Sequence, residues 1–153
     1  MSSFSKRLND LDLLIVHHMH KWGFVALRYS LGIVFFWFGL LKPLGLSPAA
    51  DLVANTVFFF DPQRFIPILG WWEVAIGVGL IYRPLLRVAI FLLFLQMPGT
   101  FLPIFLLPEV VFTQFPHGLT LEGQYIIKNL TLIAAAIVVG GTVRSRSSKD
   151  EVL

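Results

Sequence analysis

The class of fold is decided by the stretch FVALRYSLGIVFFWFGLL, residues 24–41. One charge, Arg28, interrupts this apolar run, and Lys42 and Pro43 follow it directly. A helix needs about 17–25 residues to cross the roughly 30 Å hydrocarbon core of a bilayer. The stretch therefore predicts a transmembrane helix over residues 24–42.

Three more stretches of the chain are long and apolar enough to cross a bilayer. They cover residues 66–82, 85–107 and 123–141. The apolar runs are continuous rather than alternating, which excludes a transmembrane β-barrel. With a short inner turn between the second and third spans, they predict an all-α integral membrane protein. We expect one domain over residues 1–153, an antiparallel four-helix bundle.

The composition supports this class. Hydrophobic residues make up 56% of the 153-residue chain, charged residues only 14%, and the mean hydropathy is +0.77. Soluble domains average about 25% charged residues, so the composition excludes a soluble globular enzyme and a disordered tail. The basic residues are dispersed among apolar runs, which also argues against nucleic acid as a partner. The absence of cysteine excludes disulfides, thiolate chemistry and iron–sulfur clusters.

The distribution of basic residues predicts the orientation of the spans. Nine of the twelve precede or open span one, lie at the turn between spans two and three, or follow span four. They are Lys6, Arg7, Lys21, Arg28, Arg83, Arg87, Arg144, Arg146 and Lys149. By the positive-inside rule, both termini are then cytoplasmic.

Two shorter helices are expected outside the spans. Residues 4–22 combine apolar residues at helical spacing with charges, which predicts an N-terminal amphipathic helix at the membrane interface. This helix also contains His17, His18 and His20, which we assign to a solvated face rather than to a metal site. In the outer loop, Ser47 resembles an N-cap for a helix over residues 48–58, and Pro62 and Pro67 are expected to break the chain before span two.

Polar residues in the outer half of the bundle are the candidate site. Glu73 lies about 10 Å inside span two at about 1.5 Å per residue, where a carboxylate must face protein, a partner or water. Gly70 and Gly77 share its helix face, so the acid is expected to point towards another helix. Residues of comparable depth could form one polar cluster with it, as an ion pair or a ligand site: Lys42, Gln124, Lys128 and Asn129. Alternatively, the lysines only extend to the headgroups.

Four further residues could line a cavity beside this cluster. They are Trp71, Trp72, Gln96 and Thr100. Thr100 could instead bond to a carbonyl freed by the prolines of span three, and the tryptophans could belong to interface belts. No complete catalytic set is present, so we do not expect an enzyme.

Three segments, in order, resemble a known family. They are RYSLGIVFFWFGLLK at 28–42, GWWEVAIGVGL at 70–80 and GQYIIKNL at 123–130. The series is similar to DoxX-like membrane proteins and most similar to their YkgB-type branch. The resemblance covers roughly residues 25–140, and it places Lys42, Glu73 and Lys128 at the charged positions of the pattern. It implies a four-helix bundle in a bacterial inner membrane, associated with membrane redox or oxidative-stress systems.

These observations leave three functions open. The chain could be an accessory redox protein whose polar cluster receives a quinone or a bound lipid, with no other cofactor. It could be a non-catalytic structural subunit, with membrane-protein partners or further copies of itself. A transporter or channel is the third alternative, although four spans without internal symmetry are few for one.

Overall fold

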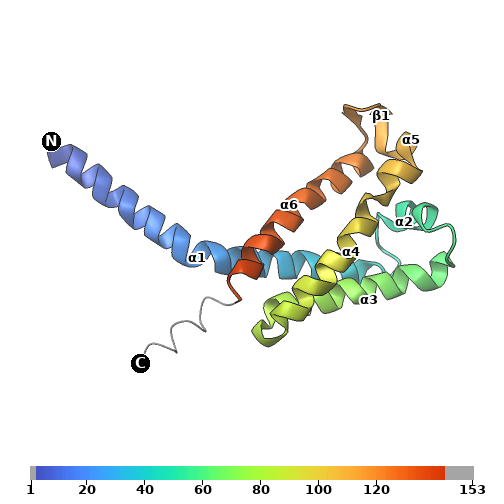
Figure 1. Cartoon of the computed structure of the whole chain (residues 1–153), viewed down its shortest axis with the longest axis horizontal. Coiled ribbons are helices and arrows are strands. Elements are labelled where there is room, and N and C mark those ends of the chain that lie inside the picture. Colours follow the sequence, from blue (N-terminus) through green and yellow to red (C-terminus); the bar gives the residue numbers. More distant parts are fainter. Residues whose placement is uncertain (1–2, 144–153) are drawn as a thin grey trace.

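The computed structural model describes the backbone of residues 3–143 and the side chains of residues 8–143 (Figure 1). In chain order the elements are α1 (Ser3–Leu41), α2 (Ala50–Thr56), α3 (Pro62–Ile81), the 3₁₀ turn η1 (Arg83–Leu85), α4 (Leu86–Leu106), α5 (Pro108–Val111), β1 (Phe112–Gln114), β2 (Gly118–Leu119) and α6 (Leu121–Gly141). Helices α1, α3, α4 and α6 are long and apolar enough to cross a membrane. The prediction of a helical multi-pass membrane protein is confirmed at this level.

Helices α1 and α3 approach each other at glycines. A Cβ added to Gly39 would lie 2.8 Å from the Gly70 carbonyl oxygen, and one added to Gly77 would lie 2.7 Å from the Gly32 carbonyl oxygen. Residue 32 thus faces residue 77 while residue 39 faces residue 70, so the two helices run in opposite directions. Small residues at this interface allow the close backbone approach from which membrane helices gain van der Waals contact.

Helix α4 returns along α3 after the η1 turn, and α6 packs on both α4 and α1. The core between these helices is aliphatic, with Ile76, Leu80 and Leu93 fully buried and Ala136 and Val139 completing it from α6. Many other large apolar side chains remain exposed, as expected of helices whose outer faces contact lipid.

Loop side chains cap the N-termini of α3 and α6. The Asp61 side chain accepts a hydrogen bond from the Gln63 amide at 3.1 Å and caps α3. Thr120 caps α6 by accepting from the Gly123 amide at 3.1 Å, while its hydroxyl donates to the Val110 carbonyl at 2.6 Å. The Thr120 side chain therefore joins α6 to α5.

Two predictions about helix boundaries were wrong. Helix α3 begins at Pro62 and continues through Pro67, where a break was expected. Helix α4 likewise contains Pro98 and Pro103 within its length. A proline removes one backbone hydrogen bond, but in apolar surroundings the remaining bonds favour keeping the helix. The short outer helix covers only Ala50–Thr56, and its N-cap is Ala49 rather than Ser47.

Helix α1 is 39 residues long and includes the segment expected to form the interfacial helix. In Figure 1 its first half, drawn in dark blue, projects away from the other helices. The side chains of Leu8, Leu11, Ile15, Met19 and Trp22 are all more than half exposed. The side chains of Lys6 and Arg7, and the basic tail after residue 143, lie outside the described residues.

Candidate functional site

The central feature of the candidate site is a buried ion pair between Lys42 and Glu73. The Lys42 Nζ donates a hydrogen bond to the Glu73 Oε2, and each residue is only 9% exposed. Lys42 directly follows the last residue of α1, while Glu73 lies within α3. Because α3 begins at Pro62, the acid is about 16 Å from the start of that helix at about 1.5 Å per residue.

The glycine contacts explain why these two residues meet. A Cβ on Gly70 would lie 2.7 Å from the Lys42 Cβ, and a Cβ on Gly39 would lie 2.8 Å from the Glu73 Cβ. Each charged residue therefore packs directly over a glycine of the opposite helix. The ammonium group also lies at the C-terminal end of α1, where the helix dipole favours a cation.

Gln96 of α4 completes the arrangement. Its Nε2 donates to the Glu73 Oε1 at 2.7 Å, so each carboxylate oxygen accepts a hydrogen bond. The other end of the amide differs, because the Gln96 Oε1 is buried and has no hydrogen-bond partner. We call Lys42, Glu73 and Gln96 the buried polar cluster. It connects α3 and α4 to the end of α1.

The charge balance of the buried polar cluster determines its stability. One ammonium group and one carboxylate give no net charge, and both are removed from solvent. The attraction between such groups roughly offsets their desolvation, whereas removal of one partner leaves an uncompensated buried charge. The cluster is therefore stable as a unit and sensitive to single substitutions.

The predicted cluster residues of span four lie elsewhere. Gln124 and Lys128 are exposed on α6, and Asn129 is half-buried. The Lys128 Nζ lies 5.3 Å from the centre of the Tyr125 ring. The two amine alternatives are thus distinguished in the structure, which places Lys42 and not Lys128 against Glu73.

The predicted cavity-lining residues have separate surroundings. Trp72 is half-buried against the core, and its Nε1 donates to the Leu92 carbonyl at 3.4 Å, while Trp71 is 57% exposed. The Thr100 hydroxyl donates to the Met97 carbonyl at 2.7 Å. Prolines at 98 and 103 free the carbonyls four residues earlier, so Met97 is not one of the carbonyls that Thr100 was expected to satisfy.

The contact between Gln96 and Glu73 was not predicted from the sequence. Gln96 was assigned to a cavity wall, although it is the only amide side chain in the long apolar run of span three. Amide side chains in membrane helices commonly form hydrogen bonds to a neighbouring helix. A single amide in an otherwise apolar run was therefore the sequence signal for a contact with another helix. Among the described side chains of residues 8–143, no group of three or more histidine, cysteine, aspartate or glutamate residues is placed to hold a metal ion.

Comparison of the chain with protein-family models, curated proteins and solved structures finds no match. The fold and the cluster therefore define a class only. The chain is a helical protein with four membrane-length helices and a buried Lys–Glu–Gln cluster among them.

Proposed function

We propose that this protein is a DoxX-like accessory component of a bacterial inner-membrane redox or oxidative-stress system. In this proposal the buried polar cluster receives the headgroup of a quinone or a lipid, and the protein binds rather than catalyses. The observation that carries it is the unpaired Gln96 Oε1 beside the Glu73 carboxylate. The resemblance of the segments containing Lys42 and Glu73 to the family supports the same assignment.

The buried Gln96 Oε1 can accept a hydrogen bond from a ligand that carries a donor. The amide orientation is fixed, because reversing it would direct the Gln96 oxygen at a carboxylate oxygen. A buried acceptor without a partner costs about 1–3 kcal/mol. A hydroxyl group, such as that of a quinol ring or a lipid headgroup, would supply the missing hydrogen bond, while Lys42 remains paired with the neighbouring carboxylate.

The test is to identify small molecules that co-purify with the protein. The wild type, Gln96→Leu and Gln124→Leu are purified in mild detergent and extracted with organic solvent, and bound quinones and lipids are quantified by mass spectrometry. Gln124→Leu is the matched control, because Gln124 is an exposed glutamine on α6. We expect the wild type and Gln124→Leu to retain a near-stoichiometric ligand that Gln96→Leu loses. Equal retention by all three would refute the headgroup site.

A second candidate function is that of a structural subunit of a larger membrane complex. The observation that favours it is the exposed apolar stripe on the projecting half of α1. Met19→Glu places a charge in this stripe, and His17→Glu places the same charge on the opposite side of the helix. Loss of stoichiometric protein partners from Met19→Glu alone would support a subunit role, and unchanged co-purification of both variants would contradict it.

The proposed arrangement in the membrane follows from the charge distribution. We infer that α1, α3, α4 and α6 form an antiparallel four-helix bundle with both termini in the cytoplasm. The end with α2, α5 and the β1–β2 hairpin then faces outward. In this arrangement the first half of α1 lies at the cytoplasmic interface, in contact with membrane lipids, and the partners are other membrane proteins or further copies of this chain.

A further inference from the structure

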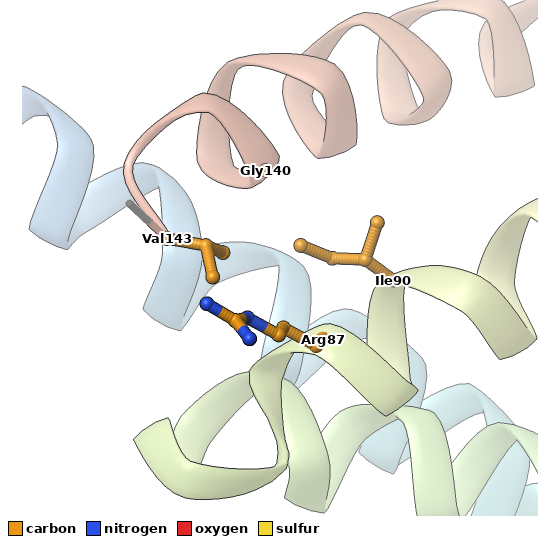
Figure 2. Close-up of a pocket in the computed structure, with 4 residues that line it drawn as sticks. All are labelled: Arg87, Ile90, Gly140 and Val143. Carbon is orange, nitrogen blue, oxygen red and sulfur yellow. The ribbon is translucent and has the colours of Figure 1, made fainter. Parts of the chain in front are cut away.

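A surface hollow lies where α4 begins and α6 ends (Figure 2). Its volume is about 400 Å³, and it is lined by Arg87, Ile90, Gly140 and Val143. Figure 2 shows the Arg87 side chain extending from α4 towards Val143, with Ile90 one turn further along the same helix. The hollow therefore combines one guanidinium group with apolar walls.

The glycine of α6 keeps this hollow open. A Cβ on Gly140 would lie 3.6 Å from the Ile90 Cδ1, which is ordinary van der Waals contact. A larger side chain could consequently be accommodated at residue 140 by filling the hollow. Helix packing does not require a glycine at residue 140. At Gly39 and Gly77, by contrast, an added Cβ would collide with the backbone of the opposite helix.

Among residues 8–143, the positive charge at this end of the bundle has no acidic partner. Gly32 packs against Ile81, so Arg28, one turn before Gly32, is level with the turn that contains Arg83. The ion pairs within residues 8–143 are Lys42–Glu73 and Arg64–Asp61, and neither involves these arginines or Arg87. The Nε of Arg28 is buried and has no hydrogen-bond partner. Arg28, Arg83 and Arg87 thus lie near the same end of the helices, and none of them is paired with a carboxylate of residues 8–143.

We propose that the hollow binds the phosphate group of an anionic lipid. Arg87 donates hydrogen bonds to the phosphate oxygens, and an acyl chain lies along Ile90 and Gly140. Guanidinium groups match phosphate oxygens in a bidentate geometry, and basic pockets between membrane helices bind anionic headgroups. The apolar walls beside Arg87 favour a lipid over a free phosphate, because a phosphate ion would leave them uncovered.

The proposal is tested by titrating the purified full-length protein with lipids and counting bound lipids by native mass spectrometry. Phosphatidylglycerol is compared with phosphatidylcholine of the same acyl chains. We expect Arg87→Gln to weaken phosphatidylglycerol binding about tenfold, to the level of phosphatidylcholine, the size of one lost charge-assisted hydrogen bond. Gly140→Leu, which fills the hollow, should weaken both lipids. Arg64→Gln, which removes an exposed arginine at the other end of α3, should change neither.

Two results would overturn the proposal. One is unchanged phosphatidylglycerol affinity in Arg87→Gln or in Gly140→Leu, each shown to be folded by its melting temperature. The other is displacement of the lipid by inorganic phosphate or glycerol phosphate at millimolar concentration, which would identify a free phosphate as the ligand.

Discussion

Breaking the Lys42–Glu73 pair should destabilise the bundle non-additively. Both side chains are about nine-tenths buried, and removal of one member of such a pair typically costs about 3–5 kcal/mol. Glu73→Gln leaves the ammonium unpaired, and Lys42→Met leaves the carboxylate with only the Gln96 amide. The double variant leaves no charge in the buried polar cluster. We therefore expect its loss of stability to be smaller than the sum of the single losses by about 2 kcal/mol or more.

The assay is reversible unfolding in mixed micelles with increasing dodecyl sulfate, followed by tryptophan fluorescence. The same cycle with Lys128→Met in place of Lys42→Met is the matched control, because the Lys128 amine is exposed on α6. That control cycle should be additive to within about 0.5 kcal/mol. Additivity in the Lys42 cycle, or coupling of Glu73 to Lys128 instead, would refute the role assigned to the pair.

Three further predictions follow from the packing, the caps and the charges. Gly77→Ala should destabilise the protein by about 1–3 kcal/mol, because the new Cβ would meet the backbone of Phe36. Gly99→Ala is the control, since an added Cβ there has no other atom within 4 Å, and it should be neutral or slightly stabilising in the same unfolding assay. Thr120→Ala should lower stability by about 1–2 kcal/mol through loss of the α6 cap, and Thr120→Ser should retain most of it. A reporter fused after Leu153 should be active in the cytoplasm, and activity confined to the other side of the membrane would reverse the proposed topology.

The spans could be predicted from the sequence, because length and apolar character alone determine whether a helix can cross a bilayer. The partner of Glu73 could not be chosen in this way. The position of a residue along its span predicts its depth in the membrane but not the direction in which its side chain points. Lys42 and Lys128 were therefore equivalent candidates for the partner of Glu73. The glycines at 39 and 70 contain the missing information, since they show which helix faces are in contact.

The prolines show a second limit of sequence reasoning. Proline was expected to break the chain at Pro67, yet Pro67 lies inside a continuous helix, as do Pro98 and Pro103. The Pro67 ring removes a bond to the carbonyl of Gln63, an exposed residue near the start of α3. The loss of one bond near a helix start is small compared with the burial that the rest of α3 achieves, and this balance depends on packing that the sequence does not display.

The length of α1 restricts what its first half can contact. A 39-residue helix is about 58 Å long at about 1.5 Å per residue, nearly twice the roughly 30 Å of hydrocarbon. Ile15 and Phe35 lie about 200° apart around the helix axis at 3.6 residues per turn. Since Phe35 is buried against the bundle, the exposed stripe that contains Ile15 faces away from it. In the described part of the chain, the other helices therefore leave this stripe more than half exposed. A bend that carries the first half of α1 outward would turn the stripe towards the bilayer, which makes the lipid surface its simplest partner and a second protein the alternative.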